Sequence, residues 1–277
     1  MVRATVIADS ISPDGVRLTT VEVKIHRFIH SELMTHRVFS RNSASSRAIP
    51  IEKQLARILS DLAMPVEFGS NQPGMQAGPP LAGKQLRRAE REWRKASKSA
   101  MKHAKKLLKL GVHKQVVNRI LEPFMWHTVI ITATDWDGFF DQRCHPDAQP
   151  EIRVAAECVR DAMEDSRPRL VGYGEWHLPY IQEDEYVLYD LSKLIKISVA
   201  RCARVSYLTH DGKRDVGKDI ELFDRLTTAA PPHWSPLEHV ATPVTSGIVD
   251  LSNFRSWVQI RHSLDTLTYL QVNEAAR

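Results

Sequence analysis

Two stretches with the pattern of β-strands open the chain, and their spacing constrains the fold more than any other feature. Residues 16–26 alternate apolar or β-branched side chains with polar ones, which is typical of a strand with one buried face. Residues 2–9 predict a second strand, and Asp14-Gly15 between the two is a strong turn signal. We therefore expect a hairpin at the N-terminus. Because this opening lacks the long apolar region of a signal peptide, we also expect a cytoplasmic protein.

Helical patterns dominate the rest of the 277 residues. Pro and Gly between 167 and 188 predict a connection, and a further strand is expected around 239–246. The fold class is therefore α+β, with dominant helices and a small antiparallel sheet, in a single catalytic domain over residues 1–277. No apolar run approaches the roughly 20 residues of a membrane span. Helices are expected at 28–36, 51–63, 113–120, 134–141, 148–165, 189–197 and 214–229.

Positive charge is concentrated in one segment, near residues 84–110. Between Lys84 and Lys109 eleven Lys or Arg oppose two Glu, a local charge of +9. Since the formal net charge of the chain is +5, the remainder carries −4 (5 minus 9). Apolar and small residues recur there at three- and four-residue steps and predict a helix packed by one narrow stripe. A solvated helix and a nucleic-acid-binding helix are both open interpretations. The Gly- and Pro-rich stretch at 65–83 predicts a flexible loop.

Arg and Ser side chains cluster between Thr35 and Arg47. Recognition of a phosphate needs fixed cations with hydroxyl and backbone donors, and an Arg guanidinium matches two phosphate oxygens. Composition alone leaves an exposed polar loop equally open. The spacing His-Arg-x-x-Ser-x-Asn-x-x-Ser-x-Arg, from His36 to Arg47, resembles the signature of the flavin-dependent thymidylate synthases. Thr35 replaces the first Arg of that signature, and Ser43 stands where the family often has Glu.

Two further blocks resemble the same family. The first, from Asn118 to Ile152, looks like its central helical region. The second starts at Ala203-Arg-Val-Ser-Tyr, continues at His233-Trp-Ser-Pro-Leu-Glu-His239, and is similar to the flavin-side segment of the family. In typical members that segment precedes the Arg-rich signature, whereas here it follows it. We interpret the order as a circular permutation, which preserves a site when the chain termini lie close in space.

The resemblance implies the reductive methylation of dUMP to dTMP by a homotetramer that uses FAD, NADPH and 5,10-methylenetetrahydrofolate. It gives catalytic roles to Arg143, beside the nucleotide base, and to His233, near the reacting face. Without a cysteine nucleophile, a guanidinium has to stabilise the ring anion as an oxyanion hole does. For Arg143 the alternative is a helix-end salt bridge with Asp141 or Asp147.

The three cysteines share no metal-type spacing, so we expect no metal site.

Binding roles follow from the same resemblance. The residues implied for the cofactor are His36, Arg37, Thr134, Ser206, His233 and Ser235, and those implied for the substrate are Glu32, Ser43, Ser45, Arg47, Arg119 and Arg143.

Departures from the family signature leave the substrate open. Thr35 removes a cation that the family shares between nucleotide and flavin, and losing one such charged hydrogen bond typically costs about 1.5–3 kcal/mol. We expect Arg261 to compensate for it. An alternative is that the substitutions at Glu32, Thr35 and Ser43 accompany a change of substrate to dCMP, or hydroxymethyl transfer without reduction. The alternative of another class, a nucleic-acid-binding protein that uses the basic helix, leaves the three blocks unexplained.

Overall fold

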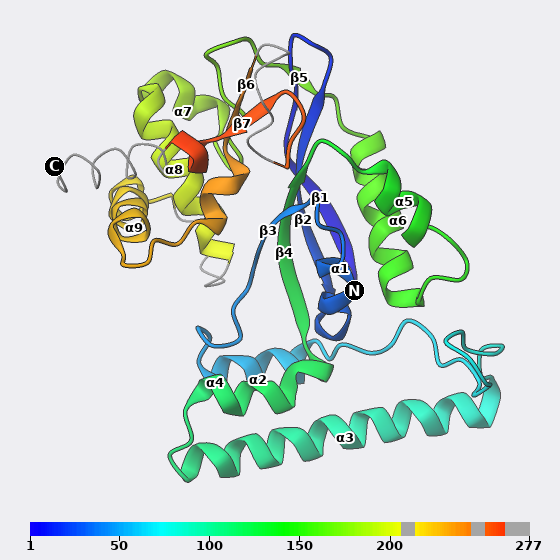
Figure 1. Ribbon diagram of the computed structural model, residues 1–277. Coiled ribbons are helices and arrows are strands. Elements are labelled where there is room, and N and C mark those ends of the chain that lie inside the picture. The colour runs from blue at the N-terminus through cyan, green and yellow to red at the C-terminus, as the bar shows by residue number, and fades with distance from the viewer. Residues whose placement is uncertain (206–213, 245–252, 264–277) are drawn as a thin grey trace, which may run out of the picture.

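The computed structural model describes residues 1–205, 214–244 and 253–263, and a five-stranded sheet runs through its centre (Figure 1). The strands follow the order β3-β4-β2-β1-β5. The expected hairpin is confirmed: β1 and β2 pair antiparallel, and Gly15 in their turn has a φ of +78°. β5 pairs with β1 in parallel, so the sheet is not purely antiparallel. The strands are β1 (Arg3–Ile11), β2 (Arg17–His26), β3 (Ser40–Ser43), β4 (Trp126–Ala133) and β5 (Arg169–Leu170).

The central strand β4 corrects the expectation of a helical region over the block from Asn118 to Ile152. β4 pairs with β2 on one side and with β3 on the other. Its residues 129–133 are all buried, so both faces of the strand are covered and no polar alternation marks it. A short apolar run of this kind is compatible with a buried helix or a buried strand. Here the β-branched residues, which suit a pleated sheet, form a strand.

The polar segment from Ser40 to Arg47 is not the exposed loop that its composition left open. Its first four residues form β3, and Asn42 and Ser46 are buried. Hydrogen bonds make this burial possible, because a buried polar group without a partner is costly. Nδ2 of Asn42 donates to the carbonyl of Cys202 at 2.8 Å, and Nδ2 of Asn118 donates to the carbonyl of Ser46 at 2.6 Å.

Helices cover one face of the sheet along its length. The main apolar core lies there, between residues such as Val23 and Val129 of the sheet and Ile152 and Val159 of α6. The predicted helix over 28–36 is shorter than expected and begins with a 3₁₀ turn. The elements on this face are η1 (Arg27–Ile29), α1 (His30–Met34), α5 (Asp137–Arg143) and α6 (Pro150–Glu164).

The opposite face carries a separate group of elements from the C-terminal part of the chain (Figure 1). Cys202 of α8 packs on Ile130 of β4, which joins this group to the sheet. The region 167–188, expected to be a connection, contains β5 and a short helix, α7. The elements of the group are α7 (Glu183–Leu188), α8 (Leu191–Arg204), α9 (Val216–Thr228), η4 (Ser235–His239), β6 (Ala241–Pro243) and β7 (Trp257–Gln259).

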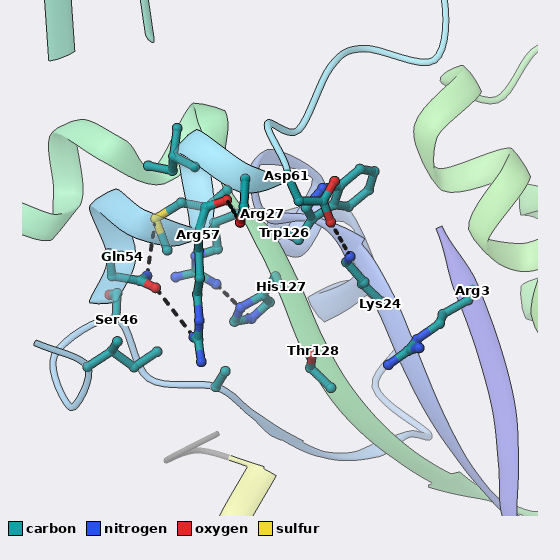
Figure 2. A pocket seen from close by; sticks show the side chains of 15 residues that line it. Arg3, Lys24, Arg27, Ser46, Gln54, Arg57, Asp61, Trp126, His127 and Thr128 are labelled. Atoms are coloured by element: carbon teal, nitrogen blue, oxygen red, sulfur yellow. Dashed lines mark hydrogen bonds and ion pairs between the residues drawn. The ribbon is translucent and has the colours of Figure 1, made fainter. Parts of the chain in front are cut away.

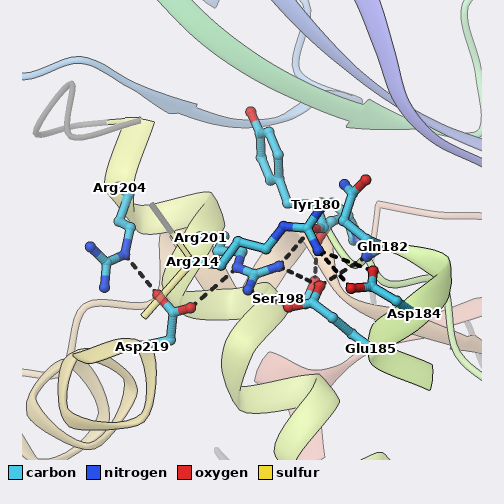
Figure 3. Close-up of polar contacts among 10 residues, drawn as sticks. Tyr180, Gln182, Asp184, Glu185, Ser198, Arg201, Arg204, Arg214 and Asp219 are labelled. Atoms are coloured by element: carbon cyan, nitrogen blue, oxygen red, sulfur yellow. Dashed lines mark hydrogen bonds and ion pairs between the residues drawn. The ribbon is translucent and has the colours of Figure 1, made fainter. Parts of the chain in front are cut away.

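A buried ion-pair cluster holds α7, α8 and α9 together (Figure 3). Arg201 of α8 donates to both carboxylate oxygens of Glu185, at 2.7 and 2.6 Å, and to Asp219 at 3.2 Å. Arg204 adds a second bond to Asp219 at 2.8 Å. The side chains of Arg201, Glu185 and Asp219 are 8%, 4% and 3% exposed, so each charge is desolvated and fully paired.

The basic helix is confirmed as α3, which lies with α2 and α4 beneath the sheet in Figure 1. The helix is packed along one narrow stripe, as expected, and its fully buried residues are Ser97, Met101 and Ala104. The layer shares an apolar cluster that includes Leu55 and Leu121. Its elements are α2 (Ile51–Ser60), α3 (Gly83–Lys109), α4 (Lys114–Val117) and η2 (Asn118–Phe124).

The loop predicted at 65–83 has no helix up to residue 82, and α3 begins at Gly83. An isolated antiparallel bridge joins Gly69 to Pro80, and the amide of Val66 donates to Oε1 of Glu151 on α6 at 2.9 Å. These bonds close the loop on itself and attach its first part to α6. Among the described helices, none combines the length and the apolar character that a membrane span requires.

Candidate active site

Arg41 of β3 shapes the Arg-rich signature by holding the end of α1. Its Nη1 donates to the backbone carbonyls of Leu33, Met34 and His36, at 3.4, 2.9 and 3.1 Å. The last carbonyls of a helix have no partner within the helix, so a guanidinium placed there satisfies them. This contact explains why α1 ends at Met34 and turns back into β3. Sequence reasoning did not identify Arg41, although an Arg in this polar stretch was the available signal.

The structure brings Arg143, predicted to be catalytic, into contact with the signature. Nε of Arg143 donates to Nε2 of His36 at 3.0 Å, and Nη2 donates to Oγ1 of Thr35 at 3.2 Å. The Thr35 hydroxyl in turn donates to the carbonyl of Glu32 at 2.7 Å. Arg143 is the last residue of α5, so two segments more than a hundred residues apart meet here.

His36 is held neutral and in a fixed orientation. Burial and the positive charges of Arg143 and Arg41 lower the pKa of His36 to about 4. A neutral imidazole can accept a hydrogen bond at Nε2, which agrees with the bond from Arg143. The ring packs edge-on against Phe139, with centroids 4.9 Å apart, and lies 5.7 Å from Phe39. The aromatic packing and the hydrogen bond together fix the plane of the Arg143 guanidinium.

Neither carboxylate considered as an alternative partner takes up Arg143. Among the described residues Arg143 forms no ion pair, with Asp141, Asp147 or any other acid. The Asp147 carboxylate lies 3.7 Å from Nδ1 of His145 instead. The positive charge of Arg143 is therefore available to an anion or to a developing negative charge.

Elements of the C-terminal block contact the signature from the other face of the sheet. Nε2 of Gln259 donates to Oγ of Ser40 at 2.8 Å, and Asn42 bonds the carbonyl of Cys202. Arg261, expected to compensate for Thr35, forms an ion pair with Glu238 and lies over the Trp234 ring at 5.8 Å. The guanidinium that contacts Thr35 in the described structure is that of Arg143.

The other residues implied by the resemblance are dispersed. Arg119 lies on the surface and pairs with Glu122 at 2.8 Å. Oγ1 of Thr134 accepts the backbone amide of Arg255 at 3.1 Å. His233 is exposed before η4, and no contact joins it to Arg143 within the described residues. Ser206 lies outside the described residues. Arg37, Arg47 and Ser235 are exposed, and Glu32, Ser43 and Ser45 are half-buried.

A buried chain of hydrogen bonds runs beneath the signature, and sequence reasoning missed it. Nδ1 of His239 lies 2.8 Å from Oγ1 of Thr132, which lies 2.7 Å from Oγ1 of Thr20. Thr20 lies 2.7 Å from Nε2 of His177, whose Nδ1 lies 2.8 Å from Oγ of Ser10. Burial lowers the pKa of both histidines to about 3, so both rings are neutral. Each member has one proton to donate, so the tautomer of His239 is coupled to that of His177.

Two solved structures are similar to part of this chain. One is a crystal structure of a UMP/dUMP methylase, PolB from Streptomyces cacaoi, bound with 5-Br dUMP: it is 16% identical, has a TM-score of 0.49, and the alignment covers 59% of this chain and 90% of that chain. The other holds the same methylase bound with 5-Br UMP, at 16% identity and a TM-score of 0.47, covering 59% and 88%. No curated protein matches the chain.

A protein family also matches this chain. A family model described as "Thymidylate synthase complementing protein" matches residues 16–169, which is more than half of the 277 residues. The matched part contains the signature from Thr35 to Arg47 and the Arg143 region, while the block from Ala203 to His239 lies outside it. The chain therefore belongs to the thymidylate synthase complementing protein family.

Proposed function

We propose that this chain catalyses the reductive methylation of dUMP to dTMP with FAD, NADPH and 5,10-methylenetetrahydrofolate. The observation that carries the proposal is the contact of Arg143 with His36 and Thr35 of the signature. Residues 1–277 act as one catalytic domain in this proposal, and the family resemblance favours a homotetramer. The substrate-side residues are those implied by the signature, with Arg143 as the catalytic cation.

Arg143 would stabilise negative charge on a carbonyl oxygen of the uracil ring. Its Nε and Nη2 donate to His36 and Thr35, which leaves the Nη1 edge without a contact among the described residues. Because the guanidinium is already oriented, its donors need little reorganisation as charge develops on the ring. A cation in this position makes C5 of the pyrimidine more nucleophilic without a cysteine. Cys144, the cysteine next to Arg143, has its pKa raised by burial, which disfavours the thiolate.

The described residues fit a flavin. Arg37 offers an exposed cation beside His36, which suits an anionic diphosphate. His36 and Arg37 are the residues that we expect to hold FAD, together with His233 and Ser235 as implied by the resemblance. Bound FAD would supply the hydride for the reduction.

The decisive experiment combines flavin binding with product analysis. We expect the purified protein to bind FAD, and its flavin spectrum to change when dUMP is added. With all cosubstrates, dUMP should gain 14 mass units, the mass of a methyl group replacing hydrogen, while dCMP should remain unchanged. A protein that takes up no FAD would contradict the proposal. Methylated dCMP, or a hydroxymethylated product, would establish the alternative substrate or reaction.

Arg143→Lys tests the catalytic role. It keeps a positive charge but loses the planar fork that contacts His36 and Thr35. We expect kcat to fall by about 10²–10³, as for loss of an oxyanion-hole donor. Arg153→Lys is a matched control, because Arg153 lies on α6 and donates to the carbonyl of Pro146 on the surface. Equal kcat values for Arg143→Lys and Arg153→Lys would remove Arg143 from the mechanism.

A further inference from the structure

A pocket of about 320 Å³ opens between the lower part of the sheet and α2 (Figure 2). It lies on the face of the sheet that also carries the C-terminal group of elements. Its floor contains Thr128 of β4 and Lys24 of β2, which are paired in the sheet. It includes none of the residues implied for the substrate or the flavin. Its hydroxyl groups come from Ser46, Ser60 and Thr128.

The pocket has a strong excess of positive charge. Arg3, Lys24, Arg27 and Arg57 line it, and Asp61 is the one acid among the lining residues. His127 adds no charge, because burial and then the charge of Arg27 hold its pKa well below the ordinary value. The lining therefore carries about +3 in a volume comparable with a small ligand site.

The carboxylates near the pocket neutralise only part of this charge. Asp61 pairs with Lys24 at 2.6 Å. Glu122 lies 3.4 Å from Arg27 and is shared with Arg119, which it contacts more closely at 2.8 Å. Arg3 and Arg57 form no ion pair with any described residue. Within the described residues, the Arg57 side chain has a single weak polar contact, with Oε1 of Gln54 at 3.5 Å.

The two unpaired arginines reach the pocket from different elements. Figure 2 shows Arg57 extending from α2 and Arg3 from β1, on opposite sides of Thr128. Like charges held in one pocket repel each other and destabilise the folded chain. An anion bound between them would remove this repulsion and use the free guanidinium donors.

We propose that this pocket binds a phosphate monoester dianion, with Arg57 and Arg3 as its principal cations and the Thr128 hydroxyl as a further donor. Guanidinium groups on different sides of the pocket can donate hydrogen bonds to different oxygens of a tetrahedral anion. A charge of +3 exceeds what a single carboxylate neutralises, whereas a dianion leaves about +1. The pocket is too small for a polynucleotide, which the lysine-lined groove of α3 would suit better. The proposal concerns binding alone and does not depend on the reaction proposed above.

The test is a calorimetric titration of the purified full chain at low ionic strength. Inorganic phosphate is the first probe. Two pairs then identify the source of the phosphate: dUMP against deoxyuridine, and NADPH against NADH. We expect inorganic phosphate to bind, and in at least one pair the member with the phosphate monoester to bind more tightly than the member without it. Arg57→Gln should weaken the phosphate-dependent binding about tenfold or more, as expected for a lost charge-assisted contact.

Lys105→Gln is the matched control, because it removes the same charge from the groove between α2 and α3, outside the pocket. Arg3→Gln is a second test variant on an exposed strand position, so an effect of Arg57→Gln on α2 itself can be recognised. Circular dichroism should be unchanged in all three, and thermal unfolding should show no loss of stability. A dUMP-selective or an NADPH-selective effect supports the proposal and names the source. Binding that is insensitive to both arginine variants, or equally sensitive to Lys105→Gln, would overturn it.

Discussion

Arginines occur in two opposite electrostatic settings in this protein. Arg201, in the cluster of Figure 3, is desolvated and makes bonds to two carboxylates. Arg57, in the pocket of Figure 2, keeps contact with solvent and has no carboxylate partner among the described residues. A buried charge without a partner would cost several kcal/mol, so Arg201 and its carboxylates depend on each other. Arg57 has no such dependence, and its charge is available to a ligand.

This difference separates structural from functional arginines better than position in the sequence does. Arg204 lies in the block that resembles the family's flavin-side segment, and Arg201 lies just before it, yet their guanidinium groups are used within the fold. Arg143 lies at the signature without an acid, as Arg57 does in the pocket. We expect substitution of an arginine paired with buried carboxylates to reduce stability most. Substitution of an arginine without a carboxylate partner should reduce ligand binding most.

The largest effect is expected for Arg201→Met, which removes the common partner of two buried carboxylates. Leaving Glu185 and one oxygen of Asp219 without this cation should destabilise the fold by about 3–5 kcal/mol, measured by urea unfolding at pH 7. Arg214→Met is the control, since Arg214 pairs with Asp184 in an exposed position and its loss should cost about 0–1 kcal/mol. Equal losses in the two variants would show that burial does not set the strength of these pairs.

The pH dependence of the same variant sharpens this comparison. Burial raises the pKa of Glu185, but the hydrogen bonds from Arg201 and from the Gln182 amide outweigh it, so the net pKa is lowered. A lowered folded-state pKa gives stability that is present above the unfolded value, about 4.3, and lost as the pH falls through the folded pKa. Wild type should therefore lose stability below about pH 4.

In Arg201→Met the sign for Glu185 reverses. Without the cation only burial remains, so the pKa of Glu185 should rise above the unfolded value and acid should favour the folded state. The gap in unfolding free energy between wild type and Arg201→Met should narrow from pH 7 to pH 4. Urea unfolding at several pH values measures it, and a constant gap would contradict the role given to Glu185.

Arg27 is intermediate between Arg201 in the buried cluster and Arg57 in the open pocket. Arg27→Gln should therefore have an intermediate effect on the free energy of unfolding. Arg27 donates to Nε2 of the buried His127 at 3.0 Å, and its ion pair with Glu122 is long. Loss of the bond to a buried acceptor should cost about 1–3 kcal/mol in chemical unfolding. The pKa of His127 should rise toward its ordinary value in the variant, because the Arg27 charge helps to lower it. Proton NMR of the His127 ring is the check, and an unchanged pKa would show that burial alone sets it.

The smallest effect on stability is expected for Arg57→Gln. No buried acid loses a partner, so the unfolding free energy should change by about 0.5 kcal/mol or less. Relief of repulsion among the pocket cations favours a slight gain. A loss comparable with that of Arg201→Met would mean that Arg57 has a structural partner, and the contrast between the two settings would fail.

Several elements were predictable because local patterns specify them. The hairpin follows from the alternation in residues 16–26 and from Asp14-Gly15, and the basic helix α3 follows from its narrow apolar stripe. β4 was not predictable in this way, because a strand buried on both faces has no alternation. The burial of the segment from Ser40 to Arg47 was not predictable either, because its hydrogen-bond partners come from distant residues such as Cys202 and Asn118.

The sequence by itself determined the family and the residue types of the site: the signature from Thr35 to Arg47 and the block with Arg143. Which arginine meets Thr35, and which arginines remain unpaired, was decided by the tertiary structure alone. The physical reason is that pairing depends on distance and desolvation between segments far apart in the chain. Arg143 lies beside His36, Arg201 is enclosed by Glu185 and Asp219, and Arg57 is left facing an open pocket. Three guanidinium groups of identical chemistry thus acquire different roles from their surroundings.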